Sequence, residues 1–524
     1  MKCAVNDKRI YMKKLLLIFS GFLAYSGSFA QEPADALRYS WYAPGGSART
    51  QAVGGAMGSL GGDITASFVN PAGLAFYKTG DFIFSPIYQF QNTKATYLDR
   101  TEKEKTNRFT WGTTGFVMGS GNGRGNVRNT SFSIAMNRTA DFNGDILYRG
   151  QNNQSSFSQK FVEELNNSGI RDSRVETQFP LGASLAYNTY WVDAVKNSSG
   201  QIDHFVTTAP VATGLLQQYT VKNRGGITEF ALGMAVNLKE KLMLGGSLGV
   251  PILNYRRETE FVEADATENP NNKFNYGIFS DKLHTSGVGF NFKAGLIYKP
   301  AEFWRLGLSV HTPTLFSLTD KYEAAVTLND DVPDADSWVD NSKSYTNNQP
   351  SEFKYLLITP YRVIGSVSYV LREIEDVTKQ KGFLTADIEY VNYKASSFKP
   401  DADNNNDEET KTYLKSLTNA IDQAYKGAFN FRAGGELKFT TIMVRLGAAY
   451  YSNPYKDIKG ENGHKLNLSG GLGYRNKGFF VDLTYVHALN KDVNFAYRLE
   501  SAPYYAANIK NTTGNVFATV GFKF

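Results

Sequence analysis

The sequence has a single cysteine, Cys3, among its 524 residues, and this shortage of thiols excludes several kinds of chemistry. Cys3 precedes the expected start of the mature protein, so the working chain has no disulfide, no thiolate nucleophile and no cysteine-ligated metal. The five histidines are scattered, and no His-Glu-x-x-His pair predicts a metal site. We therefore expect neither a metal nor any other cofactor.

Blocks of like charge and long apolar runs are absent too. The chain has 56 Lys and Arg residues against 50 Asp and Glu residues, a formal net charge of +6, with no block of five or more like charges. Nothing in this pattern predicts a nucleic-acid partner. Beyond the N-terminus, no apolar stretch reaches the roughly eighteen residues of a membrane-spanning helix, so the chain is not a helical membrane protein.

The first thirty residues have the features of a secretory signal peptide. Two lysines precede the short apolar run Leu15 to Ala24, and Ser28-x-Ala30 suits a signal peptidase, so that Gln31 begins the mature chain. Because Met12 directly precedes the two lysines, residues 1–11 are either an over-called start or a short extension.

Glycine and aromatic residues are plentiful, which is typical of β proteins: the chain has 48 Gly, 36 Phe, 31 Tyr and 5 Trp. From Phe82 onward the apolar residues alternate with polar ones at a period of two, broken by turn residues. In residues 478–487, for example, one face of the predicted strand is apolar and the other is mixed. The apolar face carries Phe479, Val481, Leu483 and Tyr485.

Such segments predict fourteen strands, an even number. The predicted strands are 81–97, 109–119, 129–147, 226–238, 242–260, 284–298, 303–327, 353–371, 382–393, 427–439, 442–452, 464–475, 478–488 and 512–524. Short connections alternate with long polar ones. The long ones are 98–108, 148–225, 261–283, 328–352, 394–426, 453–463 and 489–511.

Short turns on one rim, long loops on the other and an even strand count are typical of a bacterial outer-membrane β-barrel, here residues 81–524. The largest loop, 148–225, has apolar residues at helical spacing in Phe157 to Leu165 and in Leu181 to Val192. The last strand ends on Phe524, the kind of end that the barrel-assembly machinery reads. The alternative architecture is a secreted soluble β protein.

Residues 31–80 do not have the pattern of a spanning strand. Ser47 to Gly58 is rich in small residues, which allow close backbone packing, and the following run Asp63 to Ala75 contains the turn-forming pair Asn70-Pro71. We predict that residues 31–80 form a compact plug inside the barrel.

These features together resemble the FadL-type outer-membrane transport proteins for hydrophobic compounds. The resemblance implies a fourteen-stranded barrel, usually a monomer, closed by an N-terminal hatch with an Asn-Pro-Ala motif, which Asn70, Pro71 and Ala72 match. It also implies a small hydrophobic ligand and an exit through the barrel wall near the third strand, here 129–147. Asn137-Arg138-Thr139 is our candidate for the irregularity that would create this exit.

If the apolar columns of the barrel face lipid, the opposite columns line the lumen. These columns carry nine charged residues that we expect to form structural pairs and to anchor the plug, rather than to contact a ligand. They are Glu229, Arg305, Arg362, Asp387, Glu389, Arg432, Glu436, Arg445 and Asp482.

Signs of an enzyme are poor. Gly245-Gly246-Ser247-Leu248-Gly249 has the form of a hydrolase nucleophile elbow, but it lies within a predicted strand with no helix after it. The glycine cluster Gly119 to Gly125 is predicted to be a turn, because no helix start follows it. We therefore expect a protein that is not an enzyme.

Our main hypothesis is a hatch-gated channel in the outer membrane, in contact with its lipids, for passive uptake of small hydrophobic molecules such as long-chain fatty acids. Three alternatives stay open. Some FadL-like barrels act as shuttle-like components of type IX secretion and bind proteins instead of a small ligand. An adhesin-like barrel would use its long loops, and an outer-membrane enzyme would use Ser247.

Overall fold

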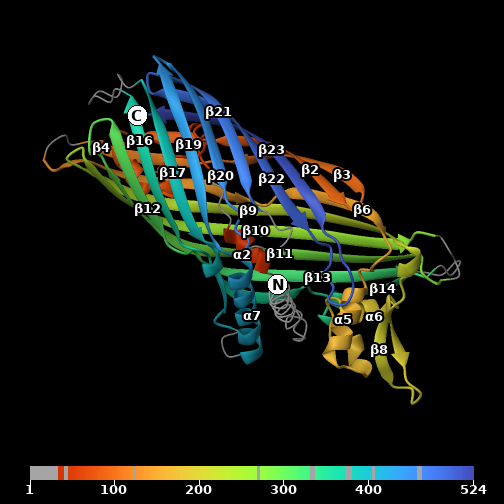
Figure 1. The fold of residues 1–524 in the computed structure, drawn as a ribbon. Coiled ribbons are helices and arrows are strands. Elements are labelled where there is room, and N and C mark those ends of the chain that lie inside the picture. The colour runs from red at the N-terminus through yellow and green to blue at the C-terminus, as the bar shows by residue number, and fades with distance from the viewer. Residues whose placement is uncertain are drawn as a thin grey trace, which may run out of the picture.

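Fourteen antiparallel strands close into one barrel in the computed structural model, because the last strand pairs with the first (Figure 1). The predicted fold class and strand number are confirmed. The structure describes residues 33–40, 45–121, 125–267, 272–330, 337–371, 381–403, 407–456 and 463–524. The predicted signal peptide and Gln31 lie outside the described residues.

Several barrel strands are interrupted by a short break. In chain order the strands are β1 (Asp81–Phe84) with β2 (Pro86–Tyr97), β3 (Arg100–Trp111) with β4 (Thr114–Gly121), β5 (Val127–Asp141) with β6 (Gly144–Asn152), β9 (Leu215–Leu238), β10 (Leu242–Asp265), β11 (Tyr276–Tyr298), β12 (Trp304–His311) with β13 (Leu315–Asn329), β15 (Ser351–Ile358) with β16 (Arg362–Leu371), β17 (Gly382–Asn392) with β18 (Ser397–Pro400), β19 (Gly427–Phe439), β20 (Ile442–Tyr451), β21 (Lys465–Asn476), β22 (Phe479–Asn494) and β23 (Ala507–Lys523).

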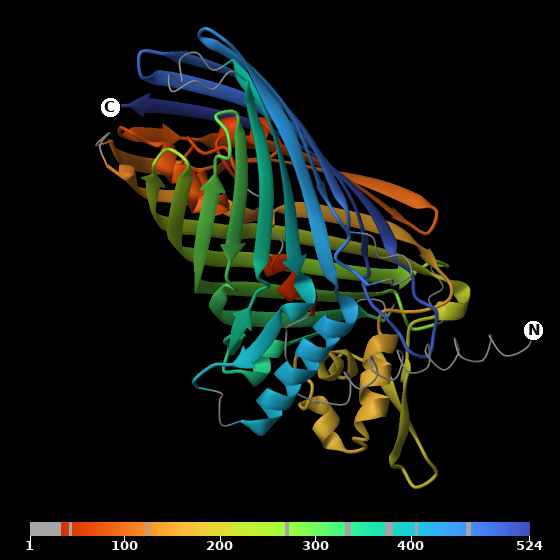
Figure 2. The same cartoon turned by 60° about the vertical axis from the view of Figure 1, so that its left-hand side comes forward.

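The helices lie in two places (Figures 1 and 2). Inside the barrel are α2 (Pro33–Ser40), α3 (Ala48–Ala52), α4 (Ala66–Val69) and η1 (Pro71–Phe76). Beyond the strand ends, in the long loops, are α5 (Gln159–Ser168), η2 (Ser173–Glu176), α6 (Ala183–Asn188), the hairpin β7 (Val192–Lys196) and β8 (Ile202–Thr207), η3 (Val211–Thr213), β14 (Trp338–Asn341), η4 (Ser342–Tyr345) and α7 (Glu408–Ala424). The short helix η6 (Tyr393–Ala395) lies in the break between β17 and β18. None of the helices in the described residues is long and apolar enough to cross a membrane.

The largest loop forms a small folded unit, and both helices predicted within it are present, as α5 and α6. Its apolar core includes Phe157, Phe161 and Trp191, and it continues onto the ends of the barrel strands through Phe261 and Phe279. The loop therefore packs against the barrel rim and shares its core with it.

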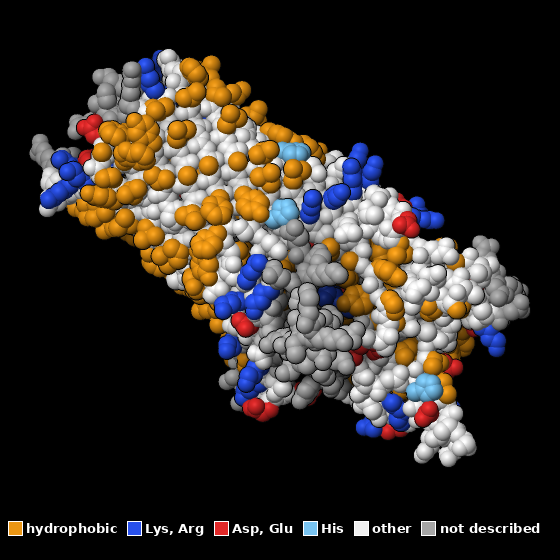
Figure 3. Space-filling view, in the orientation of Figure 1, with side chains coloured by type: hydrophobic (Ala, Val, Ile, Leu, Met, Phe, Trp, Pro, Cys, Tyr) orange, Lys and Arg blue, Asp and Glu red, His pale blue; other side chains and the backbone are white. Residues whose placement is uncertain are grey.

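The outer surface of the barrel carries a belt of exposed apolar side chains (Figure 3). On β20, Ile442, Val444 and Leu446 are exposed while Met443 and Arg445 between them are buried, as the alternation predicts. The alternation predicted on β22 is also present. In water such a belt would be costly, whereas in a bilayer it meets hydrocarbon, and a closed barrel pairs the backbone groups of its membrane-spanning strands internally. The protein is a transmembrane β-barrel of the bacterial outer-membrane type.

One predicted loop is wrong. Residues 98–108 were expected to form a long polar connection, but the chain turns tightly at Leu98 and Asp99 and then continues as β3. Arg100 to Arg108 consists of charged and polar residues only, and both faces of β3 are exposed or half-buried. A strand that stands in water on both sides lacks the apolar alternation by which the other strands are predicted.

A charge placed on the belt should destabilise the barrel. We expect Leu446→Arg, at the middle of the lipid-facing column of β20, to lower the free energy of unfolding by about 2–4 kcal/mol, because a guanidinium is costly near the bilayer midplane. Denaturant titration of the protein in lipid vesicles measures this change.

The matched control is Val339→Arg, on β14 in a long loop. Val339 is 64 % exposed and Leu446 is 69 % exposed, so the two changes differ only in whether the side chain faces lipid. Equal effects of the two substitutions would mean that the belt does not face the bilayer.

Candidate transport path

Residues 45–80, which we call the inner segment, lie inside the barrel. The beginning of this segment contacts the last strands of the barrel. Ala48 donates its N–H to Thr519 Oγ1 at 2.8 Å and accepts a hydrogen bond from Thr484 Oγ1 at 2.7 Å. Gly54 has φ +68°, and a Cβ there would lie 2.5 Å from the Ala448 carbonyl oxygen. The small residues of this segment therefore let its backbone approach the wall.

Asn70, Pro71 and Ala72 lie where the inner segment meets β10, β11 and β12. The Asn70 side chain caps η1 by accepting the Ala72 N–H at 3.1 Å, and Pro71 takes the first helical position. The Asn70 Nδ2 lies 2.6 Å from the Gly58 carbonyl oxygen and 3.2 Å from that of Leu296 on β11. One amide thus joins two turns of the inner segment to the barrel wall.

The nine charged residues predicted to face the lumen all lie on the inner side of their strands; eight are buried and Arg362 is half-buried. Five of them form ion pairs with one another. Arg432 binds Glu389, and Arg445 donates to Glu436 at 2.6 Å and to Asp482 at 2.5 Å. Such pairing offsets the cost of burying each charge.

Three others contact the N-terminal residues instead. Arg305 Nη1 donates to the Leu60 carbonyl at 2.6 Å, and Asp387 accepts the Gly58 N–H at 3.1 Å. Arg362 Nη2 donates to the carbonyl of Ser40, the last residue of α2, at 2.6 Å. The wall therefore holds the inner segment and α2 by charged hydrogen bonds, the stronger kind.

Sequence reasoning missed two partners of these charges. Lys293 on β11 binds Glu229, the ninth residue, across β10, and Arg49 of the inner segment lies 3.6 Å from the Glu436 carboxylate. Lys293 belongs to the inward column of its strand, so extending the alternation over β11 would have found it. Nothing in the local sequence pairs Arg49 with Glu436.

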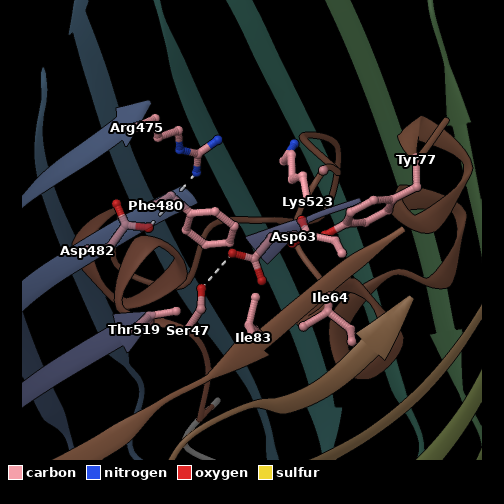
Figure 4. Close-up of a pocket in the computed structure, with 12 residues that line it drawn as sticks. Ser47, Asp63, Ile64, Tyr77, Ile83, Arg475, Phe480, Asp482, Thr519 and Lys523 are labelled. Atoms are coloured by element: carbon pink, nitrogen blue, oxygen red, sulfur yellow. Dashed lines mark hydrogen bonds and ion pairs between the residues drawn. The ribbon is translucent and has the colours of Figure 1, made fainter. Parts of the chain in front are cut away.

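Between the inner segment and β21 to β23 lies a small polar pocket of about 10 Å³, room for about one water molecule (Figure 4). Ser47 donates to Asp63 at 2.5 Å on one side, and Arg475 lies 3.9 Å from Asp482 on the other. Lys523 also lines it. This pocket marks a polar boundary between the inner segment and the wall.

On the long-loop side of the inner segment lies an apolar chamber. We define its wall by barrel residues that form one buried cluster: Ala140, Ile227, Leu253, Tyr255, Leu283, Phe316, Leu318, Tyr355, Leu357 and Val391. The chamber is filled by the protein itself. Ala36, Leu37 and Tyr39 of α2 pack into the same cluster.

Helix α7 covers the chamber from the long-loop side, because its apolar residues Leu414, Leu417 and Ile421 belong to the chamber cluster. The helix begins at Asp407, whose carboxylate accepts hydrogen bonds from the Thr410 hydroxyl and from the N–H groups of Glu409 and Thr410. These hydrogen bonds lower the pKa of Asp407, and the one from the Thr410 hydroxyl has the largest effect.

A cavity of about 50 Å³ separates the chamber from the inner segment. Its lining includes Tyr39, Thr139, Lys293, His311 and Arg362. This volume holds a few water molecules but no hydrocarbon chain, so an apolar ligand could enter only if α2 moves.

The barrel wall is irregular beside the third strand. Between Arg138 and Ala140 the register of β5 against β9 shifts, at the irregularity predicted for Asn137-Arg138-Thr139. In the described residues no backbone ladder joins β3 to β6. Side chains join them instead: the Thr106 hydroxyl donates to the Asp145 carboxylate at 3.2 Å, and Arg149 lies 2.7 Å from Glu102. Arg108 also lies 2.8 Å from Asp141, at the end of β5. We call this side-chain junction the seam.

The start of the inner segment lies against the membrane-side end of the seam. The Gly46 carbonyl accepts the Thr113 N–H at 3.3 Å, at the break between β3 and β4. Gly45 approaches the third strand so closely that a Cβ there would lie 2.2 Å from the Arg138 carbonyl oxygen. Residues 45 and 46 therefore lie where the second strand is interrupted and where the register of the third strand shifts.

The hydrolase-like motif around Ser247 is not at a strand-to-helix turn. Ser247 lies in the middle of β10, paired with Gly233 on β9 and with Lys293 on β11. This position differs from that of a nucleophile elbow. Among the described residues no group of three or more His, Cys, Asp or Glu side chains is placed to hold a metal ion.

Comparison with known proteins gives a likeness of structure. No protein-family model and no curated protein matches the sequence. A FadL homologue of Pseudomonas aeruginosa matches with a TM-score of 0.52 at 12 % identity, covering 93 % of this chain and 100 % of that chain. This protein has the FadL-type barrel fold. The P. putida toluene transporter TodX has the same fold, with a TM-score of 0.50, 12 % identity and coverage of 93 % and 99 %.

Removing the Asn70 amide should loosen the inner segment of this FadL-type barrel. We expect Asn70→Ala to speed amide hydrogen exchange in residues 45–80 by about tenfold or more, since each lost hydrogen bond is worth about 1 kcal/mol. The barrel strands should exchange as before. Exchange followed by mass spectrometry measures both regions in one sample.

Asn476→Ala is the matched control. Asn476 is exposed at the short-turn rim, and its side-chain amide donates to the hydroxyl of Tyr474 on the same strand, not to the inner segment. Faster exchange in the control, or none in Asn70→Ala, would show that Asn70 does not anchor the inner segment.

Proposed function

We propose that the protein is an outer-membrane channel for the passive uptake of small hydrophobic molecules, and that the inner segment is its hatch. One observation carries the proposal: residues 45 and 46 lie where the second strand is interrupted and where the third strand shifts its register against β9. A segment that covers a break in the barrel wall would open a path through the wall when the segment moves away. The outer membrane has no ATP supply, so movement down a gradient is the simplest energetics.

The apolar chamber supplies the binding site in this proposal. Its aromatic and aliphatic wall offers the buried apolar surface that holds a hydrophobic ligand, and α7 covers its outer end. A ligand that enters past α7 would take the place of Leu37 and Tyr39. Displacement of α2 would break the hydrogen bond from Arg362 to Ser40, which precedes the inner segment by a few residues. Ligand binding would thereby be coupled to the hatch.

The proposed exit is lateral, through the seam. The cavity below the chamber reaches Thr139 and Ala140, at the register shift of the third strand. Withdrawal of residues 45 and 46 would leave this side of the cavity facing the break in the wall. A hydrophobic molecule would then pass into the membrane without crossing the polar pocket near Asp482.

Long-chain fatty acids are our proposed substrate class. The chamber is apolar, while the cavity at its inner end is lined by Lys293, which is paired with Glu229, and by Arg362, cations that a carboxylate would meet. TodX, a solved structure with this fold, is named a toluene transporter. Oleate and toluene are therefore the two probes to compare.

A disulfide between the hatch and the third strand should stop uptake. Ser67 of α4 and Ser133 of β5 have their hydroxyl oxygens 2.9 Å apart, so Ser67→Cys with Ser133→Cys places two thiols in reach. We expect radiolabelled oleate uptake, in a Gram-negative host without its own transporter of this type, to fall to background when oxidised and to return on reduction.

The matched control crosslinks the long-loop rim through Asn275→Cys with Asn329→Cys, whose side chains are 3.0 Å apart in the native protein. Its uptake should not depend on oxidation. Full uptake by the oxidised Ser67→Cys/Ser133→Cys variant would contradict the proposal that the inner segment is a hatch.

Mass spectrometry of an organic extract of the purified protein tests the ligand class, with an unrelated barrel purified identically as the control. An enriched, stoichiometric fatty acid supports the channel and its substrate. An empty lumen together with a tightly bound protein would favour the alternative, a shuttle-like secretion component.

A further inference from the structure

The short-turn rim of the barrel carries a band of lysines, which we call the lysine rim. Each short turn whose residues are described from β9 to β23 carries or adjoins one of them, and two more flank the barrel's first and last strands. The set is Lys78, Lys239, Lys241, Lys299, Lys381, Lys438, Lys477 and Lys523. Six of these eight are exposed, and Lys299 and Lys438 are half-buried.

The lysine rim is continuous because neighbouring turns are hydrogen-bonded through their backbones. The Lys299 N–H donates to the Lys241 carbonyl at 2.8 Å, and the Lys438 N–H donates to the Lys381 carbonyl at 2.9 Å. The Lys523 N–H donates to Gly478, the residue after Lys477, at 2.7 Å. The lysines are therefore spread along the described part of the rim, from β9 to β23, and are not confined to one turn.

Aromatic side chains of the lipid-facing belt stand next to the lysine rim. Phe439, Phe479, Phe522 and Phe524 are all exposed within two residues of a rim lysine. Rings of this kind lie at the membrane interface, and lysine side chains extend along apolar surface to place their charge in the headgroup layer. Figure 3 shows basic side chains at the end of the apolar belt.

Basic residues outnumber acidic ones in the described turns of this rim. Among the described turn residues the only acids are Glu240 and Glu302, and Glu240 makes a 4.0 Å contact with Lys78. The opposite end of the barrel differs, since β3 alternates Glu102 and Glu104 with Lys103 and Lys105. The net positive charge is therefore a property of the short-turn rim and not of both interfaces.

We infer that the lysine rim binds the phosphate groups of anionic phospholipids, of the phosphatidylglycerol kind, in the membrane leaflet at the short-turn end. A ring of cations at headgroup level matches a shell of lipid, which also surrounds the barrel. A protein partner would instead require charge gathered on one side. In outer-membrane barrels the short turns face the periplasm, where the leaflet consists of phospholipid.

The test replaces four rim lysines, in K239Q/K241Q/K438Q/K477Q. Lys381 is left unchanged because the acids Glu373, Glu375 and Asp376 of its turn lie outside the described residues. The matched control, K103Q/K105Q/K222Q/K415Q, removes the same charge from exposed lysines at the long-loop end. Each protein is inserted into nanodiscs of equimolar phosphatidylglycerol and phosphatidylcholine, and native mass spectrometry counts the lipids that each one retains.

We expect the native protein and the control to retain phosphatidylglycerol over phosphatidylcholine by about threefold or more, and the rim variant to lose this preference. High salt should reduce the preference of the native protein, because exposed charges are screened. If the fourfold variant does not fold, the K239Q/K241Q variant replaces it, and we expect that variant to lose part of the lipid preference.

Equal retention of both lipids by the native protein would overturn the inference, as would a preference that survives in a folded rim variant. Loss of a co-purifying acidic protein from the rim variant, with the lipid preference unchanged, would assign the lysine rim to a protein partner and would also overturn it.

Discussion

Closure of the sheet is the constraint on which the rest of the structure depends. In hydrocarbon no water is present to satisfy an unpaired N–H or C=O, so every strand within the bilayer needs two neighbours. β23 provides this by pairing with β22 on one side and with β1 and β2 on the other. The barrel can leave a strand edge unpaired only where the edge meets water or protein. The edge of β3 is such a place, and there charged side chains and residues 45 and 46 cover the gap.

Closure of the sheet also creates a lumen, which the inner segment fills in part. A ring of this size encloses a lumen, and the inward columns of its strands carry charges that must find partners. Arg445 is fully buried yet contacts both Glu436 and Asp482, while Asp387 binds a backbone N–H of the inner segment. The same columns hold small residues where the plug approaches, so that wall and plug fit each other by size and by charge. The lumen is thus filled on its short-turn side by both polar and apolar contacts of the inner segment, and on its long-loop side by the apolar chamber cluster.

The sequence was sufficient for the parts of the fold that meet lipid. On β20 and β22 the bilayer demands apolar residues at every second position, and this demand is visible along the chain. The first part of β3, Arg100 to Arg108, was not predicted as a strand, because it has no apolar alternation. The break at Asn137 to Thr139 was visible as polar residues in a membrane strand.

In the candidate transport path, the positions of the inward-facing charged residues could be predicted from the sequence. Their partners could be predicted only in part. Glu436 and Arg445 pair across adjacent strands joined by a tight turn, a neighbourhood that the hairpin pattern implies. Arg49 joins them from far along the chain, and α2 enters the apolar chamber among residues from many strands. Such contacts depend on how the closed ring places distant segments, which no local pattern records.

The position of the C-terminal residue limits how this protein can be labelled. Phe524 exchanges two backbone hydrogen bonds with Gly80 at the short-turn rim, so a peptide fused there would adjoin this pair. The turn between β7 and β8 is a better site for an epitope or a fluorophore. Residues 197–200 there are exposed at the tip of a hairpin whose two strands pair only with each other. A display tag inserted at Ser199 would reach solvent beyond the loops while both termini stayed native.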